Sequence, residues 1–299
     1  RETTPHLNEF AERSIVYHQH HTAAPYTTPA TASLLTGLLP WKHRAFTIGD
    51  RVHPNYTHRN LFSYFQDAGY YLSAYTHNAL ADVLLQQFSS SMDKRLHMTS
   101  MMQSDDFVFT HLLGHDFVMA QEAKQFLLIQ GRETRAASLF YSKLFLPMFN
   151  ERILRFNREY RKQFPLGVPN AGAGYFFFLE DAVKGIEAQL LANQSPFLSY
   201  FHLLPPHAPY KPNSDFYLKF DGDGYEPPAL EDHFFTEGMK RGRLKLWRRE
   251  YDEFIGYVDQ QFHQLIQNLD AQGILDNTVV VLTSDHGELF ERGIWGHLT

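Results

Sequence analysis

An aspartate and a histidine stand next to each other at Asp285-His286, directly after an apolar, β-branched stretch of the chain. One carboxylate oxygen and one imidazole nitrogen suit a divalent cation such as calcium, magnesium, manganese or zinc. Gly287 lets the backbone turn sharply behind the pair, and His297 could reach back to the same place. The alternative is that Ser284 or Asp285 only caps a following helix.

A threonine at the amino end of a predicted helix, Thr27, is the candidate nucleophile. It lies two residues before Pro29, where backbone N–H groups and the helix dipole favour an anion and help to ionise a hydroxyl. Beside a metal ion that lowers its pKa, this hydroxyl could attack phosphorus or sulfur. Thr27-Thr28-Pro29 is also the sequence of an ordinary helix cap, and this alternative stays open.

Polar residues follow two further predicted strands, where ligands of open parallel sheets bind. His207 lies in a rigid turn between Pro206 and Pro209 and could contact an anionic substrate or protonate a leaving group. The alternative is that His207 is an ordinary loop histidine with no part in the chemistry. Asn78 comes soon after a strand that ends at Thr76.

The elements that must position these residues alternate between strands and helices. Strands are predicted at 14–20, 70–76, 197–204 and 278–283, and helices at 5–12, 30–36 (with Thr28-Pro29 as its start), 59–68, 178–193 and 251–272. The β-branched run 278–283 is typical of a parallel strand buried on both faces. This order predicts an α/β fold with a mostly parallel sheet sandwiched by helices. We expect residues 1–104 and 164–299 to form the core and 105–163 to be a helical insertion.

Composition narrows the class of protein. Of the 299 residues, 43% are hydrophobic and 20% are charged, which excludes a disordered or collagen-like chain. The net charge of −6 gives no support for a nucleic-acid partner. The count of 0 cysteines excludes disulfides and thiolate chemistry. No stretch approaches the about 18 apolar residues that span a bilayer.

The motifs together resemble the sulfatase family of the alkaline-phosphatase-like superfamily. That family's nucleophile signature is Cys or Ser, any residue, Pro, a small residue, Arg, three residues, then Leu-Thr-Gly; residues 27–37 here read TTPATASLLTG. Residues 2–7, 197–210 and 276–288 are similar to its first helix, its histidine-proline loop and its "DNT…TSDHGE" metal loop. The resemblance covers about 1–92 and 178–299. Transferred by position, it implies the metal ligands Asp285 and His286, the nucleophile Thr27, a contact of His207 to the transferred group or leaving oxygen, and anion contacts from Asn78 and His297.

The resemblance implies an ester hydrolase that uses one divalent metal ion, calcium, magnesium, manganese or zinc. Its substrate would be an anionic ester: a sulfated or phosphorylated sugar, a lipid headgroup or an aryl ester. Two residues depart from the pattern, because Thr27 cannot be converted to formylglycine and Thr31 stands where the signature has Arg. Threonine nucleophiles are typical of the related phosphoethanolamine and phosphoglycerol transferases.

Two alternatives therefore stand beside the hydrolase: such a transferase with an upstream membrane region, and a degenerate domain that binds an anion without turnover. The family's first strand, which carries further aspartate ligands, is expected before residue 1. Residues 1–299 alone are then expected to be weak or inactive. The resemblance favours a periplasmic or other extracytoplasmic location, with membrane attachment through the upstream region.

Overall fold

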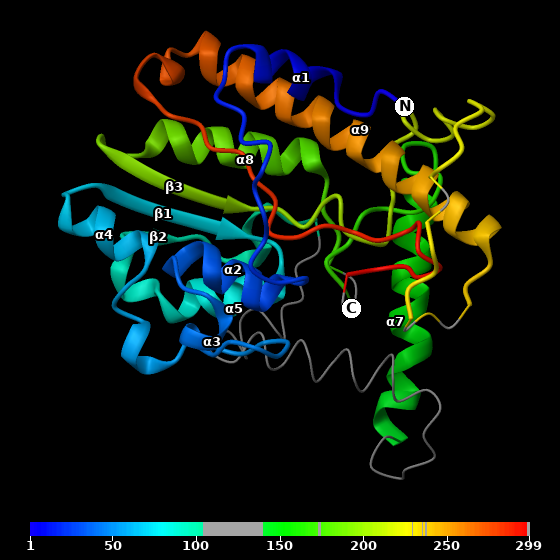
Figure 1. Cartoon of the computed structure of the whole chain (residues 1–299), viewed down its shortest axis with the longest axis horizontal. Helices are drawn as coiled ribbons and strands as arrows, with labels where there is room; N and C mark the ends of the chain where they lie inside the picture. The colour runs from blue at the N-terminus through cyan, green and yellow to red at the C-terminus, as the bar shows by residue number, and fades with distance from the viewer. Residues whose placement is uncertain (104–139, 173–174, 229, 235, 237, 298–299) are drawn as a thin grey trace.

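A computed structural model describes most of the chain, namely residues 1–103, 140–172, 175–228, 230–234, 236 and 238–297. Its centre is a parallel sheet of β1 (Tyr71–Thr76), β2 (Lys94–Arg95) and β3 (Phe197–His202), in the order β2-β1-β3. β1 and β3 pair along their whole length, from Tyr71 opposite Phe197 to Thr76 opposite His202. Their carboxyl ends therefore meet at one edge of the sheet (Figure 1).

Helices cover both faces of the sheet (Figure 1). Their bounds are α1 (Pro5–Glu12), α2 (Thr27–Thr36), α3 (Pro40–His43), α4 (Leu61–Asp67), α5 (Ala79–Gln87), α7 (Phe140–Glu159), α8 (Leu179–Ala192) and α9 (Arg241–Ala271), with short 3₁₀ turns at Pro54–Tyr56, Ser89–Ser91, Met98–Met101 and Ile274–Asn277. Leu72 and Ala74 of β1 pack with α2, α4 and α5, whereas Tyr75 packs with Ile186 of α8. This alternation is the period of a strand that is buried on both faces. The predicted α/β sandwich is confirmed.

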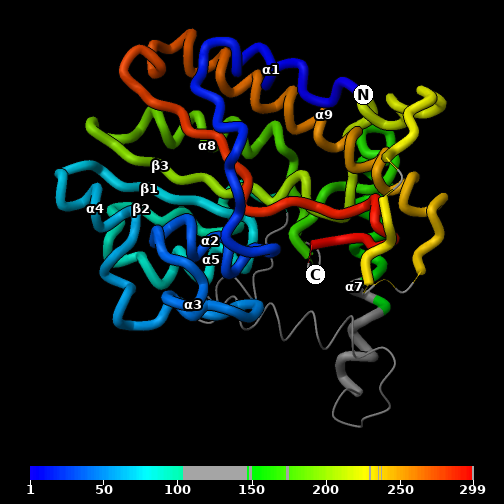
Figure 2. Tube along the Cα trace, viewed as in Figure 1, coloured from blue at the N-terminus to red at the C-terminus, as the bar shows by residue number. Residues whose placement is uncertain are grey.

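The long amphipathic helix is confirmed and is longer than predicted, because α9 begins at Arg241 rather than near Tyr251. Its extra turns are rich in charge but carry Leu244, which is buried. The helix ends before Gly273, whose φ of 70° is the left-handed conformation expected there. Figure 2 shows α1 lying along α9 on the outside of the molecule.

Two predicted strands are wrong. Segments 14–20 and 278–283 run without strand pairing, and their apolar side chains are exposed, with Ile15 at 82% and Val279 at 88%. They lie side by side, since His20 contacts Thr283 and Thr22 Oγ1 donates to the carbonyl of Asp285. β-branched residues favour an extended backbone, but a strand also needs a paired neighbour for its N–H and C=O groups, and no described residues supply one here.

The expected insertion at 105–163 is described only in part. Residues 104–139 lie outside the described part of the chain, and α7 forms the helical remainder. Where the structure describes them, side chains of its last turns, among them Ile153 and Phe156, pack against the cluster around Phe176 and Tyr257. The division into core and insertion stays a prediction. Within the described residues, no helix has the length and apolar character needed to cross a membrane.

Candidate active site

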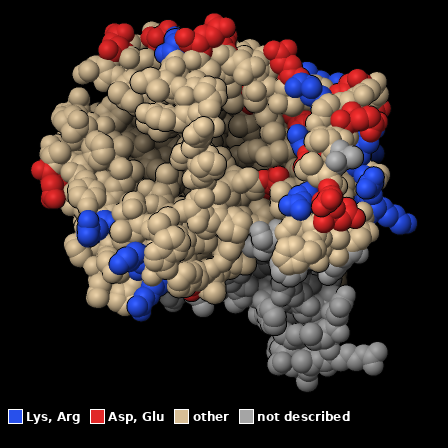
Figure 3. Space-filling model, in the orientation of Figure 1, with Lys and Arg blue, Asp and Glu red and all other residues tan. Residues whose placement is uncertain are grey.

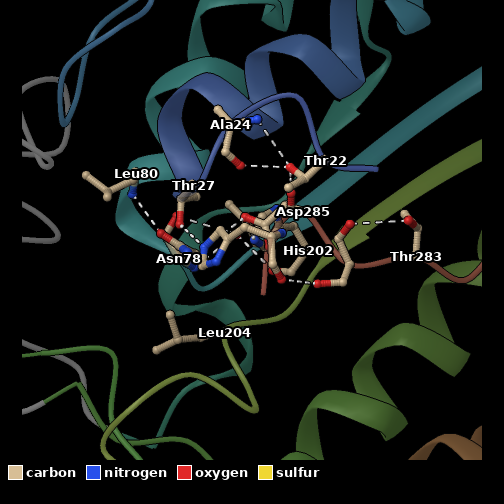
Figure 4. A network of polar contacts seen from close by, with 12 residues as sticks. Thr22, Ala24, Thr27, Asn78, Leu80, His202, Leu204, Thr283 and Asp285 are labelled. Carbon is tan, nitrogen blue, oxygen red and sulfur yellow. Dashed lines mark hydrogen bonds and ion pairs between the residues drawn. The ribbon is translucent and has the colours of Figure 1, made fainter. Parts of the chain in front are cut away.

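The carboxyl edge of the sheet gathers most of the predicted site residues. Thr27 begins α2, Asn78 follows β1, and Asp285 lies in the loop that passes the end of β3. Figure 4 shows these three side chains with His202 around one point. In Figure 3 this face of the molecule is hollowed between the layer of α9 and the layer of α2 to α5.

Thr27 lies at the first position of α2, and its side chain is buried. The residue before the helix is Tyr26, so the predicted cap at Thr28 is wrong; the Thr28 hydroxyl instead accepts the N–H of Gly49 at 3.1 Å. The first intrahelical bond runs from Ala30 N–H to the carbonyl of Tyr26. The N–H groups of Thr27 and Thr28 precede it and belong to the positive end of the helix.

His286, one of the two candidate metal ligands, contacts both the candidate nucleophile Thr27 and the other candidate ligand, Asp285. Its Nε2 lies 3.3 Å from Thr27 Oγ1 and 3.6 Å from Asp285 Oδ2. Its Nδ1 is 3.0 Å from the carbonyl of Gly287, which accepts only from an N–H. The ring therefore carries its proton on Nδ1 and presents the Nε2 lone pair to Thr27 and Asp285.

The two residues fit a divalent cation by the chemistry of their donors. Asp285 uses Oδ1 to accept the N–H of His286 at 3.0 Å, whereas its buried Oδ2 has no hydrogen-bond partner among the described residues. A buried carboxylate oxygen without a partner costs free energy, and a cation between this oxygen and His286 Nε2 would remove that cost. The capping alternative does not apply, since no helix follows Asp285 in the described chain.

His297 and His207 add two further imidazole rings beside His286. The ring of His297 lies 4.4 Å from that of His286 and 4.9 Å from that of His207. Glu288 holds His297 through a 3.1 Å contact to its Nδ1. His207 donates from Nδ1 to the carbonyl of Ala208, and burial is the main cause that lowers its pKa below the ordinary histidine value.

Asn78 has a structural task at the same edge. Its side-chain oxygen accepts the N–H of Leu80 at 3.0 Å and so caps α5. This leaves the Nδ2 amide as the group that could contact an anion. Its role in substrate binding stays a prediction.

Sequence reasoning assigned no role to two histidines beneath this edge. His202 is the last residue of β3, and its Nε2 lies 3.8 Å from Asp285 Oδ2. His77 is fully buried after β1 and accepts the N–H of Leu204 at 2.6 Å. Burial, with the nearby ring of His202, lowers the pKa of His77 to about 3, so the ring is neutral at pH 7. Their places at the ends of strands were the available signal: His77 follows the strand that ends at Thr76, and His202 ends β3 within the segment 197–210 that is similar to the histidine-proline loop.

Comparison with solved structures gives the class of fold. A phosphonate monoester hydrolase of Agrobacterium radiobacter superposes with a TM-score of 0.62 at 15% identity, over 98% of this chain and 60% of that chain. The phosphonate monoester hydrolase of Silicibacter pomeroyi gives a TM-score of 0.60, also at 15% identity, over 99% and 60%. This chain therefore has the α/β fold of the alkaline-phosphatase-like hydrolases.

The family follows from the sequence. A family model described as Sulfatase matches residues 1–299, so the chain belongs to the sulfatase family. A choline-sulfatase of Rhizobium meliloti is 23% identical over 97% of this chain and 54% of its own length. A multifunctional alkaline phosphatase superfamily protein of Trinickia caryophylli is 21% identical over 95% and 57%. The chain thus spans just over half the length of these curated relatives.

Proposed function

We propose that this protein transfers the phosphoryl or sulfuryl group of an anionic ester first to Thr27 and then to water. The observation that carries the proposal is that Thr27, near the start of the chain, lies against the adjacent residues Asp285 and His286. Thr27 Oγ1 and Asp285 Oδ2 lie 3.3 Å and 3.6 Å from the same nitrogen, His286 Nε2. A hydroxyl, a carboxylate and an imidazole lone pair at one point form the arrangement of an activated nucleophile beside a cation.

Asp285 and His286 are the residues of this chain that would hold the divalent cation. When bound, the cation would lower the pKa of the neighbouring hydroxyl and neutralise charge on the transferred group. Their oxygen and nitrogen donors suit manganese or zinc as well as calcium or magnesium.

The first step forms a bond from Thr27 Oγ1 to phosphorus or sulfur and breaks the bond to the ester oxygen. The N–H groups of Thr27 and Thr28 point their positive ends toward the anion. The hydroxyl proton of Thr27 passes to solvent, and the leaving ester oxygen takes up a proton and departs as an alcohol. His207 is suited to this delivery, because its Nδ1 is engaged with Ala208 and its Nε2 can take up a proton and pass it to the leaving oxygen.

The second step returns Thr27 to its free form. A water oxygen bonds to phosphorus or sulfur, and the bond to Thr27 Oγ1 breaks. The water loses a proton and Oγ1 takes one up through solvent, so phosphate or sulfate departs and the Thr27 hydroxyl is restored. An acceptor alcohol in place of water would make the protein a transferase, as with the phosphoethanolamine and phosphoglycerol transferases that use threonine. The substrate belongs to the class of phosphorylated or sulfated sugars, lipid headgroups or aryl esters.

One observation favours a second candidate, a domain that binds an anionic group without turnover. Thr31 stands where the family signature has Arg, and its buried hydroxyl has no hydrogen-bond partner among the described residues. An arginine would offer two or more donors to the anion, which threonine does not. A domain that only binds would need neither the hydroxyl of Thr27 nor turnover.

Turnover by the full-length protein separates the candidates. We expect hydrolysis of an aryl phosphate monoester, an aryl phosphodiester, an aryl phosphonate monoester or an aryl sulfate, with the divalent cation present. Thr27→Ala removes the nucleophile and is expected to lower kcat by about 10³-fold or more. Thr36→Ala is the matched control, since Thr36 is a buried threonine at the other end of α2. Unchanged kcat in Thr27→Ala would exclude the nucleophile, and binding without turnover of any ester would favour the second candidate.

A further inference from the structure

Two histidines and a glutamate meet on the outer helical layer, away from the carboxyl edge of the sheet. His6 and Glu9 lie three residues apart on α1, which places them on one face of that helix. His263 lies on α9, opposite them. One ligand atom from each of the three residues lies within 4.8 Å of the other two.

The register between α1 and α9 is fixed by a buried carboxylate. Asp259, which is fully buried on α9, accepts the N–H of His6 at 3.1 Å and the N–H of Leu7 at 2.8 Å. Asp259 thereby caps the first turn of α1. His263 is one helical turn further along α9, so it faces His6 as a direct consequence of this cap.

An aromatic contact lies in the same interface. Phe10 of α1 meets Phe262 of α9 edge to face, with ring centroids 5.3 Å apart. The rings of His6 and His263 stack with centroids 4.0 Å apart and planes inclined by 20°. Both imidazoles are half-buried, whereas Glu9 is exposed. Two rings held this close need only rotate about their side-chain bonds for one nitrogen of each to reach a common cation.

The types of the three donor atoms indicate which metal ion the site would bind. Two imidazole nitrogens and one carboxylate oxygen are the protein ligands of zinc in sites that keep a fourth position for water. Calcium and magnesium prefer sites made of oxygen. Figure 3 shows acidic side chains gathered along the edge of the molecule that α1 and α9 form, and this charge attracts a cation.

We propose that His6, Glu9 and His263 form a zinc-binding site that ties α1 to α9. The site is separate from the candidate active site, since its residues belong to the outer helices and not to the carboxyl edge of the sheet. Zinc bound there joins two segments that are more than two hundred residues apart in the chain. Because the unfolded chain does not hold the three donors together, zinc binding stabilises the docked position of α1.

Zinc stoichiometry tests the proposal in a full-length protein that carries His286→Ala, a change that removes a zinc donor at the candidate active site. After equilibration with zinc and dialysis, we expect this background protein to retain one more zinc ion per chain than the same protein with His6→Ala or His263→Ala. His58→Ala, which removes an exposed histidine, is the matched control and should retain the ion. Equal zinc content in all four proteins would overturn the proposal.

Two further measurements keep the result independent of folding defects. Hydrogen exchange in the amides of α1 should slow on addition of zinc in the background protein and stay unchanged in His263→Ala. The zinc-edge X-ray absorption spectrum of the background protein should contain scattering from two imidazoles. A spectrum with oxygen ligands alone would contradict the site even if zinc were retained.

Discussion

At the scale of single residues, the chemistry depends on which atoms of each imidazole are already engaged. His286 and His207 both donate from Nδ1 to a backbone carbonyl, so each keeps Nε2 for the site. His77 has the opposite arrangement, because its Nε2 accepts a backbone N–H from Leu204. The first two rings can therefore serve ligation and proton transfer, whereas His77 supports the loop that carries His207.

The proposed role of His207 predicts a dependence on the leaving group. His207→Ala should slow the hydrolysis of alkyl esters by about 10²-fold or more, because an alkoxide needs a proton as it leaves. Esters of an acidic phenol should be affected much less, since the phenolate is stable without one. Rates for a series of esters with leaving groups of different pKa measure this. An equal loss of rate for all of them would show that His207 has no role in protonation.

The lowered pKa of His77 predicts how the stability of the protein depends on pH. Its pKa is about 3 in the folded protein, below the ordinary value of 6.5, so the folded state binds fewer protons than the unfolded state between these values. Its contribution to stability is complete above pH 6.5 and is lost as the pH falls toward 3. The loss between pH 6.5 and about pH 4 is on the order of 3 kcal/mol.

The variant His77→Gln keeps an acceptor for Leu204 N–H but cannot be protonated. We expect its free energy of unfolding to fall less steeply with acid than that of the unchanged protein, as measured by urea unfolding at a series of pH values. Some acid sensitivity should remain, because burial also lowers the pKa of His43, whose Nδ1 accepts the N–H of Ala45. Identical slopes in the two proteins would rule out this role of His77.

At the scale of elements, α2 is the part that brings the nucleophile into place. Its residues Ala32 and Leu35 pack in the cluster with β1, α4 and α5, which fixes the axis along which Thr27 is presented. The helix ends at Gly37, whose φ of 65° lies in the left-handed region and whose N–H donates to the carbonyl of Ser33 at 2.8 Å. A side chain at Gly37 would strain this ending.

Gly37→Ala should lower the free energy of unfolding by about 1 kcal/mol, because an alanine at positive φ is strained even though no atom lies within 4 Å of the added carbon. Gly242→Ala is the matched control: this glycine lies in the first turn of α9 with open space around it, and alanine there should stabilise the helix by less than about 1 kcal/mol. Urea unfolding of both variants shows whether each substitution lowers or raises the free energy of unfolding. Stabilisation of the Gly37 variant would contradict the helix end described here.

At the scale of the whole molecule, sequence and structure agree where a local pattern decides the outcome. The stripe from Tyr251 to Leu269 and the strands before His77 and after Pro196 follow from periodicity and turn residues. The structure of segment 278–283 does not follow from such a local pattern, because strand pairing depends on a neighbouring backbone and not only on the residues of the segment itself. His202 was missed for a similar reason, since its nearness to Asp285 depends on how β3 and the later loop are arranged in space.

The residues of the candidate site could likewise be predicted from the sequence only where a local motif contains them. Thr27, Asp285 and His286 were found because each lies within a run of residues with a recognisable order. The fold then brings Thr27 Oγ1 within 3.3 Å of His286 Nε2, which lies 3.6 Å from Asp285 Oδ2. The pairing of Glu288 with His297 was not predicted. Such pairing depends on the exact path of residues 288–297, which is set by tertiary contacts such as that of Trp295 with Tyr210.

The measurement that tests the central claim most directly is the mass of the enzyme trapped during turnover. The full-length protein is mixed with an activated aryl ester in the presence of the divalent cation and quenched with acid, and its peptides are mapped by mass spectrometry. We expect one added phosphoryl or sulfuryl group on the peptide that contains Thr27, located at that residue and absent from Thr27→Ala. An adduct on another residue, or unchanged turnover in Thr27→Ala, would contradict the account.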